Sequence, residues 1–447
     1  MEVWRQAAAL LARLTARLGK ARIAAVGLSG AMHTLTPIGP GNIPLARATT
    51  WQDACAAELV KPLSEQIDAD QLYRETGCPL LPVYHPPRLR WMRLHQPELF
   101  GRAERFVGIK DYVLFQLTGQ WATDITSAAA TGLLDIHRLM WHEPALELST
   151  MTAERLPVLA LPRAVIGRVN SQASQLTGLP VDTPVVAGVP DGAAANIAVG
   201  AGGIGRTAIS TSTSAAVRRC VAQPHFDARM RSWCYVLDID RWLAGCALNN
   251  AGSAVNQLRR QFYPHLRERK GFQQLFIDAE QAPPGAEGLV ALPFFIPERG
   301  VPWDHRLPNV MDGLITRHSP AHHIRATLEG IAHSIAAACR TAAGTVGGES
   351  LDEPIHATGG LMRFPLWRRI LADVLGRPIV ALEGVDASAM GAAMVARAGV
   401  DRDFSPYQAM AAYQEIVTYP RDDYRPIYEA AHARFLALIE QHTPASV

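Results

Sequence analysis

A single carboxylate follows an apolar, strand-like run near the middle of the sequence. The run from Val185 to Val189 leads through Pro190 to Asp191, and an alanine-rich, helix-like stretch follows it. A carboxylate placed where a buried strand passes into a helix lies at the sheet edge where α/β folds bind their ligands. Asp is also an ordinary N-cap for the helix expected over residues 192–198. The sequence alone leaves these two interpretations of Asp191 evenly balanced.

Two other segments join a strand to residues that are typical of phosphate contacts. In the first, a strand-like run passes into consecutive hydroxyl residues, among them Ser212, Thr213 and Ser214. Small side chains let backbone amides and hydroxyls approach a phosphate, although a Ser/Thr-rich edge strand is the simpler alternative. In the second, Gly359 and Gly360 stand between a predicted strand and a predicted helix. That order suits phosphate or nucleotide contact as well as a plain tight turn.

A fourth group of polar and aromatic residues lies near the N-terminus. Met32 and His33 follow the strand-like run at residues 23–28, and Trp51 and Asp53 come soon after. An indole can cover the C–H face of a polyol while a carboxylate accepts its hydroxyls. Taken alone this signal is weak, because a packed Trp and a capping Asp are common structural devices.

Short β-rich runs alternate with Ala- and Leu-rich helical stretches, which favours an α/β fold. Helices are predicted over 1–18, 59–67, 88–94, 111–117, 320–343, 366–375 and 424–441. Strands are predicted over 23–28, 184–188, 207–211, 289–293, 354–357 and 378–382. A glycine cluster at 200–205 marks the expected boundary between domains spanning residues 1–199 and 200–447. This cluster matches G-x-G-x-x-G, but a helix precedes it and a strand follows, which argues against a dinucleotide site.

Composition narrows the classes of function. The chain has 447 residues, 48% of them hydrophobic and 19% charged, which excludes a disordered protein. Lys and Arg number 43 against 41 Asp and Glu, so we expect no nucleic-acid partner. No apolar run approaches the ~20 residues of a membrane span, and we expect no membrane association. Six scattered cysteines without a C-x-x-C pair indicate free thiols in a cytoplasmic protein.

Taken in order, these segments resemble the FGGY family of carbohydrate kinases, within the actin-like ATPase superfamily. The resemblance rests on motifs spread over essentially the whole chain. They are Ser-Gly-Ala-Met-His (29–33), Trp-Gln-Asp (51–53), Thr-Gly-Cys-Pro (76–79), Lys-Asp-Tyr (110–112), Gly-Leu-Leu-Asp-Ile (132–136), Gly-Val-Pro-Asp-Gly (188–192), Glu-Arg-Gly-Val-Pro-Trp-Asp (298–304), Arg-Ala-Thr-Leu-Glu-Gly (325–330), Thr-Gly-Gly (358–360), Ala-Asp-Val-Leu-Gly (372–376) and Met-Gly-Ala-Ala (390–393). Within the family the chain is most similar to the gluconokinase branch.

The resemblance implies a two-domain actin-like ATPase fold of ribonuclease H-like topology. It implies ATP-dependent phosphorylation of a sugar or sugar-acid hydroxyl, with gluconate converted to 6-phosphogluconate as the foremost case. The alternatives are a xylulokinase-like ketopentose kinase and a catalytically inactive remnant that binds ligand. The implied cofactors are ATP and Mg²⁺, with metal ligands unknown, and the chain could form a homodimer.

Roles for individual residues also follow from the resemblance. Asp191 corresponds to the catalytic base, which also contacts the sugar. The sugar-side wall corresponds to Met32, His33, Trp51 and Asp53. The ATP-binding positions are Thr213, Ser214, Gly252, Asn256, Gly359, Gly360 and Phe364.

The sequence departs from the family pattern at several places. Cys55 stands where the family usually has Arg, and Ser212 and Pro297 replace glycines. The family also opens with a strand bearing Asp-x-Gly-Thr-Thr, its first phosphate loop, and this sequence contains no such segment. We therefore expect an N-terminal domain that is incomplete at its start, with residues 23–28 forming an unpaired apolar edge. A chain of that kind is expected to self-associate and to lack kinase activity.

Overall fold

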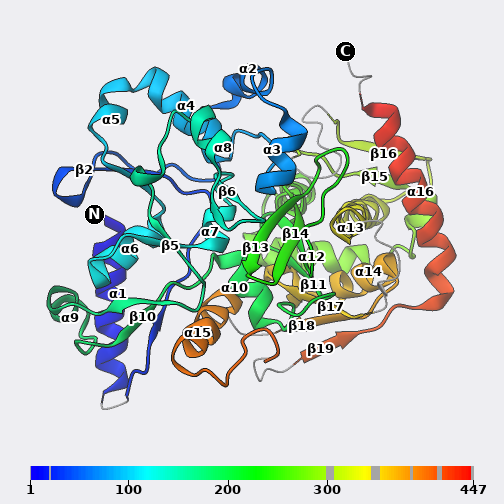
Figure 1. Cartoon of the computed structure of the whole chain (residues 1–447). Helices are drawn as coiled ribbons and strands as arrows, with labels where there is room; N and C mark the ends of the chain where they lie inside the picture. The colour runs from blue at the N-terminus through cyan, green and yellow to red at the C-terminus, as the bar shows by residue number, and fades with distance from the viewer. Residues whose placement is uncertain are drawn as a thin grey trace.

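The computed structural model describes residues 2–19, 22–298, 307–343, 353–382, 386–409 and 415–443. Residues 299–304 of one family motif lie outside these ranges. Figure 1 shows the N-terminal half, coloured blue to cyan, on one side of the molecule and the C-terminal half, green to red, on the other. Among the described residues, no helix is long and apolar enough to cross a membrane.

The N-terminal half mixes many short helices with small sheets. Its helices are α1 (Glu2–Leu18), α2 (Val60–Ser64), α3 (Ala69–Thr76), α4 (His85–His95), α5 (Pro97–Arg102), α6 (Ile109–Thr118), α7 (Ile125–Ala129), α8 (Glu143–Leu148), α9 (Ser171–Thr177) and α10 (Asp191–Ala198). Its strands are β1 (Val26–Gly27), β2 (Thr36–Gly39), β3 (Ile43–Pro44), β4 (Arg105–Val107), β5 (Ala122–Asp124), β6 (Leu134–Asp135), β7 (Met140–Trp141), β8 (Val158–Ala160), β9 (Val165–Arg168) and β10 (Pro184–Val186). β1 pairs in parallel with β10, and β10 pairs with β9.

The C-terminal half is built on one large sheet. Its helices are α11 (Gly252–Phe262), α12 (Glu268–Ala279), α13 (Pro320–Ala343), α14 (Pro365–Leu375), α15 (Ala387–Val400) and α16 (Arg425–His442). Its strands are β11 (Thr207–Thr211), β12 (Ala215–Val221), β13 (Trp233–Asp238), β14 (Arg241–Leu248), β15 (Val290–Leu292), β16 (Val310–Asp312), β17 (Ile355–Thr358), β18 (Ile379–Leu382) and β19 (Glu415–Thr418). Seven of these strands form one sheet in the order β13-β14-β12-β11-β17-β18-β19, and β15 pairs with β16 separately.

The parallel strands of this sheet determine where its loops gather. β11 and β17 run parallel, with Ser210 opposite Thr358, and β18 continues the parallel set. The carboxyl ends of β11 and β17 therefore meet at one edge of the sheet. The hydroxyl run at 212–214 and the glycine pair at 359–360 leave the sheet from that edge. The topology thus brings together two segments that lie about 145 residues apart in the sequence.

The two halves pack through α10 and α15, which are both rich in small residues. A Cβ at Gly391 in α15 would lie 1.9 Å from the carbonyl oxygen of Ala194 in α10. A Cβ at Gly27 in β1 would lie 2.4 Å from the carbonyl oxygen of Ala392. Helix α15 of the C-terminal half therefore approaches both α10 and β1 at backbone distance, which only glycine permits.

Most predicted elements are present with shifts of a few residues. Strand β11 and helix α13 have the predicted bounds, and a helix precedes the glycine cluster while a strand follows it. The strand predicted over 23–28 is wrong in length, because β10 spans three residues and pairs with Val26 and Gly27 alone. The single helix predicted over 59–67 is also wrong: α2 is shorter and follows a 3₁₀ turn. Asp191 is not the N-cap, which is Pro190.

Candidate active site

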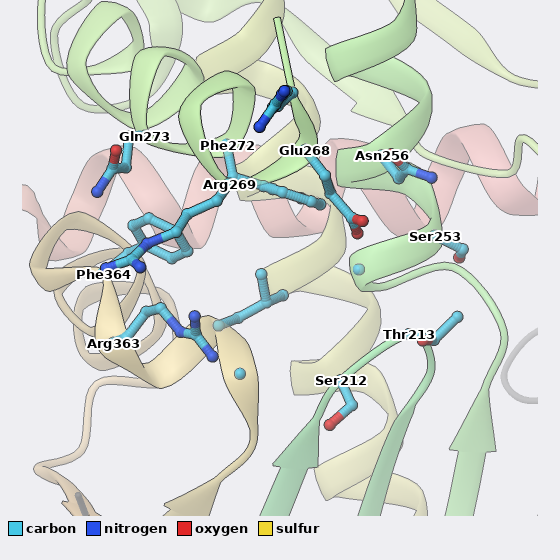
Figure 2. A pocket seen from close by; sticks show the side chains of 14 residues that line it. Ser212, Thr213, Ser253, Asn256, Glu268, Arg269, Phe272, Gln273, Arg363 and Phe364 are labelled. Carbon is cyan, nitrogen blue, oxygen red and sulfur yellow. The ribbon is translucent and has the colours of Figure 1, made fainter. Parts of the chain in front are cut away.

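An open cavity beside the loops of the seven-stranded sheet is lined wholly by the C-terminal half. It has a volume of about 680 Å³. Its lining residues are Ser212, Thr213, Gly252, Ser253, Asn256, Arg267, Glu268, Arg269, Phe272, Gln273, Gly360, Leu361, Arg363 and Phe364. Figure 2 shows Thr213, Asn256 and Phe364 on different sides of this space, hereafter the nucleotide-side cavity.

Backbone contacts fix the floor of the nucleotide-side cavity. The turn between β11 and β12 is closed by the Ser212 amide, which donates to the Ser214 carbonyl at 2.9 Å. The amides of Gly252 and Ser253, at the start of α11, donate to the Ser212 and Thr213 carbonyls at 2.9 and 2.8 Å. A Cβ at Gly252 would lie 2.2 Å from the Ser212 oxygen, so this docking requires glycine.

Gly359 makes the sharp exit from β17 possible. Its φ of +106° lies in the region that favours glycine, and a Cβ there would lie 2.1 Å from the Thr211 carbonyl oxygen. The neighbouring strand end therefore touches the backbone of Gly359 directly. Gly360 then begins a 3₁₀ turn that faces the cavity.

The predicted ATP-binding residues divide into two groups in the structure. Thr213, Gly252, Asn256, Gly360 and Phe364 line the nucleotide-side cavity. Ser214 and Gly359 do not line it, and they shape the turns that bound it.

Sequence reasoning missed the wall that α12 contributes to this cavity. Arg267, Glu268, Arg269, Phe272 and Gln273 come from the start of that helix and from the residue before it. A run of charged residues on an amphipathic helix is normally a solvated face, so the pattern did not indicate their role. The Phe272 ring among these charges was the available signal.

Asp191 lies outside the nucleotide-side cavity, at the first residue of α10. Its amide donates to the Gly30 carbonyl at 3.0 Å, and its Oδ1 accepts the Gly192 amide at 2.7 Å. It lines a second cavity of about 900 Å³, together with residues 29–31 and the start of α15 at Asp386 and Ser388. Asp191 is exposed as a whole residue, but protein atoms packed near its carboxylate remove part of the surrounding water. Burial raises the pKa of Asp191, while the Arg218 guanidinium and the Gly192 amide act to lower it.

The predicted sugar-side residues are only partly brought together. Met32 and His33 line a narrow cavity of about 40 Å³ that shares Gly30 and Ala31 with the cavity at Asp191. His33 has a φ of +59° and packs edge-on against Tyr84, with ring centroids 5.4 Å apart. The Tyr84 hydroxyl lies 3.0 Å from the Tyr235 hydroxyl of the C-terminal half. Both halves of the chain therefore contribute aromatic rings around His33.

Trp51 and Asp53 do not line the cavities described above. The Trp51 side chain is 39% exposed, and the Asp53 carboxylate accepts the Cys55 amide at 2.9 Å. Buried Arg88, which sequence reasoning missed, connects their loop to His33. Its guanidinium donates to the His33 carbonyl at 2.6 Å, to the Asp53 carbonyl at 3.1 Å, and to the Thr50 carbonyl.

A buried ionic cluster lies next to the sugar-side residues Met32 and His33. The Lys110 ammonium lies 2.8 Å from Asp124 Oδ2 and 3.6 Å from Asp111 Oδ1, and it donates to the Ala187 carbonyl at 3.0 Å. Burial opposes the charge of Lys110, but the two carboxylates outweigh it and raise its pKa. Lys110 thus stays ionised and holds the backbone just beyond β10, in the segment that leads to Asp191.

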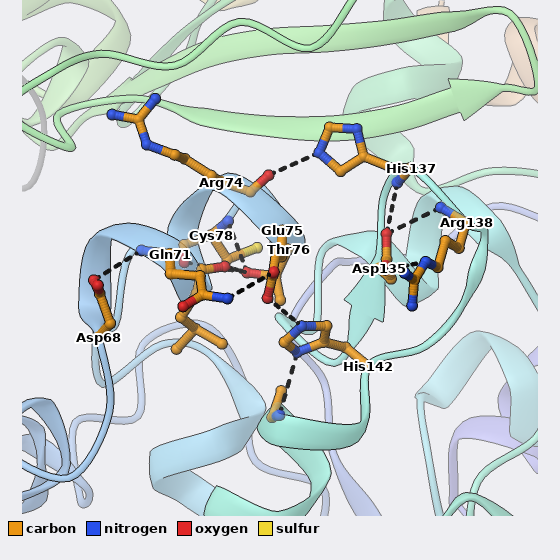
Figure 3. A network of polar contacts seen from close by, with 12 residues as sticks. Asp68, Gln71, Arg74, Glu75, Thr76, Cys78, Asp135, His137, Arg138 and His142 are labelled. Carbon is orange, nitrogen blue, oxygen red and sulfur yellow. Dashed lines mark hydrogen bonds and ion pairs between the residues drawn. The ribbon is translucent and has the colours of Figure 1, made fainter.

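A polar network joins α3 to residues 135–142 within the N-terminal half, next to a contact with the C-terminal half (Figure 3). Glu75 accepts from Gln71 at 3.0 Å and lies 2.8 Å from His142 Nε2. Just beyond it, the Cys234 amide of β13 donates to the Gly77 carbonyl at 2.8 Å. A Cβ at Gly77 would lie 1.8 Å from the Cys234 oxygen, so the strand meets this turn at backbone distance.

The described residues contain no group of three or more His, Cys, Asp or Glu side chains that could hold a metal ion by themselves. Mg²⁺ in phosphoryl-transfer sites is usually held by one or two carboxylates together with substrate phosphates and water. Asp191 and Asp386, which line the same cavity, supply carboxylates of that kind.

The chain has a two-domain α/β architecture in which one cavity is lined by phosphate-type turns of the C-terminal half and a separate cavity holds the Asp191 carboxylate, and both features suit a phosphotransferase. Comparison with protein families gives the same class. The model of the FGGY family of carbohydrate kinases, N-terminal domain, matches residues 1–198, and that of the C-terminal domain matches residues 209–399. The chain therefore belongs to the FGGY family of carbohydrate kinases.

Individual relatives agree with this assignment. The chain is 29% identical over 381 residues to a gluconokinase of Bacillus licheniformis, covering 83% of this chain and 73% of the relative. It is 26% identical over 389 residues to a xylulose kinase of Escherichia coli (strain K12), covering 84% and 76%. A crystal structure of gluconate kinase from Lactobacillus acidophilus superposes with a TM-score of 0.92 and 28% identity, covering 98% of this chain and 88% of that one.

These comparisons correct one expectation. The N-terminal domain model matches from residue 1, so the expectation of an N-terminal domain that is incomplete at its start is not supported. The expected self-association and loss of activity rested on that incompleteness and lose their basis. The predicted domain boundary at residue 200 remains a prediction, as do the individual site residues.

Proposed function

We propose that this carbohydrate kinase transfers the γ-phosphoryl group of ATP to a hydroxyl of gluconate, giving 6-phosphogluconate. The observation that carries the proposal is the position of Asp191. It stands at the start of α10, hydrogen-bonded to the Gly30 carbonyl, between the Met32–His33 loop and the C-terminal half. The gluconokinase and gluconate kinase relatives support gluconate as the acceptor.

In the proposed reaction Asp191 accepts the proton of the sugar hydroxyl as that oxygen attacks the γ-phosphorus. A positioned base of this kind typically contributes ~10²–10⁴-fold to the rate. The Gly192 amide, 2.7 Å from Oδ1, orients the carboxylate. Met32 and His33 would form the sugar-side wall, and Trp51 and Asp53 would join it from the neighbouring loop, which Arg88 ties to His33 through three carbonyls.

ATP is the proposed occupant of the nucleotide-side cavity. Thr213, Gly252 and Gly360 would meet the phosphates, and Asn256 and Phe364 would face the adenosine. The stack of Phe364 on Phe276, with ring centroids 4.1 Å apart, keeps that wall rigid. Mg²⁺ bound with the phosphates would neutralise charge as it does in other phosphoryl-transfer sites. We also propose that the protein is cytoplasmic and forms a homodimer.

The second candidate is phosphorylation of a ketopentose, which the xylulose kinase relatives favour. Gluconate, xylulose, ribulose and glycerol should be compared with ATP and Mg²⁺ in a coupled assay of ADP release. We expect gluconate to give the highest kcat/KM. A clear preference for xylulose would move the protein to the second candidate. Binding of ATP and sugar without any turnover would indicate a catalytically inactive remnant.

A further inference from the structure

The narrow cavity beside Met32 and His33 contains a buried histidine that the proposed reaction does not yet use. His85 is the first residue of α4 and is only 5% exposed. It lines the cavity of about 40 Å³ together with residues 30–34. Among the described residues, no atom forms a hydrogen bond with its buried Nε2. Because buried polar atoms in proteins are almost always hydrogen-bonded, this nitrogen is a candidate for contact with a ligand.

Several contacts fix the backbone that carries this ring. The His85 amide donates to the Thr131 carbonyl at 2.8 Å. Two prolines follow His85 directly and restrict the backbone of the first turn of α4. Three residues after His85, the Arg88 guanidinium donates to the His33 carbonyl at 2.6 Å. The imidazole is therefore carried by a rigid segment, which suits a group that must meet a substrate at a defined position.

The surroundings of His85 keep its imidazole neutral. Burial lowers the pKa of His85 well below its ordinary value, and the nearby charge of Arg88 acts in the same direction. A neutral imidazole has one N–H donor and one acceptor nitrogen. A hydroxyl group therefore suits Nε2 in either tautomer, as a donor to the bare nitrogen or as an acceptor from the N–H.

The size of the narrow cavity limits what Nε2 can meet there. One water molecule needs roughly 10–15 Å³, so a cavity of about 40 Å³ holds a hydroxyl-bearing end of a substrate but not a whole sugar. The remainder of the sugar fits in the adjoining cavity of about 900 Å³ at Asp191, which shares Gly30 and Ala31 with the narrow cavity.

The charges around the narrow cavity favour a hydroxyl over a carboxylate. Asp111 also lines this cavity, and its Oδ1 lies 3.6 Å from the Lys110 ammonium. Among the described residues, no donor forms a hydrogen bond with that oxygen. A second carboxylate, Asp124, is closer to the ammonium, at 2.8 Å. With two carboxylates for one ammonium, the cluster attracts a hydroxyl hydrogen and opposes the entry of another carboxylate.

We propose that His85 is a substrate-binding residue whose Nε2 hydrogen-bonds a hydroxyl of the acceptor sugar inside the narrow cavity. This inference rests on the proposed function, in which the sugar lies beside Asp191. It also orients the substrate: the hydroxyl bound by His85 and the hydroxyl facing Asp191 belong to different carbons, and the carboxylate of gluconate lies outside the narrow cavity. No sequence motif pointed to His85.

The first test compares an apolar and a polar replacement of His85 in the full chain. His85→Leu removes the nitrogen and should raise KM for gluconate about 10-fold, the size of one hydrogen bond, with KM for ATP within about twofold of wild type. His85→Gln keeps a polar group near the position of Nε2, so its KM for gluconate should lie between the two. His95→Leu, at an exposed histidine at the other end of α4, is the matched control and should leave both KM values unchanged.

Monodeoxy forms of gluconate test the hydrogen bond itself. One of the 2-, 3-, 4- and 5-deoxy compounds should bind the wild type about 10-fold more weakly than gluconate does. The same compound should lose little further affinity in His85→Leu, because its partner is already gone. Calorimetric titration without ATP measures these dissociation constants. If the losses from the substitution and from every deoxy compound simply add, no hydroxyl contacts His85 and the inference is wrong.

Thermal unfolding separates substrate binding from a structural role. His85→Leu breaks no protein hydrogen bond at Nε2, so Tm should not fall below that of the wild type. A lower Tm with an unchanged KM for gluconate would show that the nitrogen serves the fold, through a buried water, and would overturn the inference. Where both Tm and KM change, the additivity of the deoxy compounds decides.

The outcomes also distinguish the inference from the proposed function. If the wild-type chain phosphorylates none of the sugars, the proposed function is overturned. If the wild type is active on gluconate and both His85 variants keep its KM, the inference alone is overturned and the assignment of Asp191 is unaffected.

Discussion

The nucleotide-side cavity and the sugar-side region are built in different ways. The nucleotide-side cavity is shaped by backbone turns, with Gly252 and Gly359 pressed against neighbouring carbonyls, and its charged side chains are exposed at the rim. The sugar side is shaped by buried side chains, with Lys110 and Arg88 holding carboxylates and carbonyls in place. Backbone amides suit phosphates that every kinase shares, whereas a particular sugar needs polar groups at defined positions. Loss of one side chain should therefore harm the sugar side more than the nucleotide side.

Removal of the buried cation at Lys110 should have the largest effect on the fold. Lys110→Met leaves Asp111 and Asp124 buried without their ammonium partner. Breaking a buried ion pair in this way typically costs ~3–5 kcal/mol, and we expect a loss of that size in the free energy of unfolding. Urea unfolding measures it. Lys61→Met, at an exposed lysine of the same domain, is the control, and an equal loss there would remove the special role of Lys110.

Removal of Arg88 should affect the sugar more than the nucleotide. Arg88→Met leaves the carbonyls of His33, Thr50 and Asp53 without their donor and frees the loops that carry the sugar-side residues. Each unsatisfied buried group costs ~1–3 kcal/mol, so KM for gluconate should rise ~10-fold or more while KM for ATP stays within about twofold. Steady-state kinetics with each substrate varied in turn provide the measurement. Arg102→Met, at an exposed site, is the control. Equal increases in both KM values would contradict the division between the two sides.

A single methyl group on the nucleotide side should give the opposite pattern. Gly359→Ala forces a Cβ toward the Thr211 oxygen at a φ of +106°, a strain of about 1–3 kcal/mol. KM for ATP should rise several-fold with little change in KM for gluconate. Gly376→Ala is the matched control, since its φ is also positive but no atom lies within 4 Å of the added carbon. If both variants behave alike, the contact with Thr211 does not shape the cavity.

Buried histidines away from both sides should give the C-terminal half a modest acid sensitivity. His333 and His432 meet between α13 and α16 with their Nδ1 atoms 3.3 Å apart. Burial, with help from nearby positive charge, lowers the pKa of His333 to about 3 and that of His432 to about 4. In the unfolded chain these histidines take up protons near pH 6.5, whereas the folded pair stays neutral there. The free energy of unfolding therefore keeps its full value above that pH and falls as the pH drops toward 4. Each histidine should lower the free energy of unfolding by about 1 kcal/mol between pH 6.5 and pH 5.5.

His432→Phe removes one of these titrating groups. The slope of the free energy of unfolding between pH 6.5 and pH 5.5 should become shallower than in the wild type, whatever the variant's absolute stability. His265→Phe, at an exposed position, should leave the slope unchanged. A slope that is the same in all three proteins would show that the pair does not cause the acid sensitivity.

Local patterns predicted much of the scaffold. The pattern of apolar residues predicted β11 and α13 with their bounds, and the glycine pair at 359–360 was predicted as a turn, in which Gly359 packs against the Thr211 carbonyl. For Asp191 the local pattern left a ligand-site carboxylate and an N-cap evenly balanced, and the structure places the N-cap at Pro190. These features depend on residues close together in the sequence.

Features that depend on distant segments were not predicted. Arg88 joins three loops that only the fold brings together, and Arg218 meets Gly192 across the domain boundary. The α12 residues of the nucleotide-side cavity resemble a solvated helix face in the sequence. The length of β1 depends on its partner, because only two residues of β10 pair with it. The apolar run at 23–28 carries no information about where β10 ends.

The most direct test of the account is Asp191→Asn, measured for both turnover and ATP binding. The change keeps the size of the side chain and its contact with the Gly192 amide but removes the base. We expect turnover with saturating gluconate to fall by ~10²-fold or more, while the dissociation constant for ATP stays within about threefold of wild type. Near-normal turnover would contradict the assignment of the base. A parallel loss of ATP binding would contradict the separation of the carboxylate from the nucleotide-side cavity.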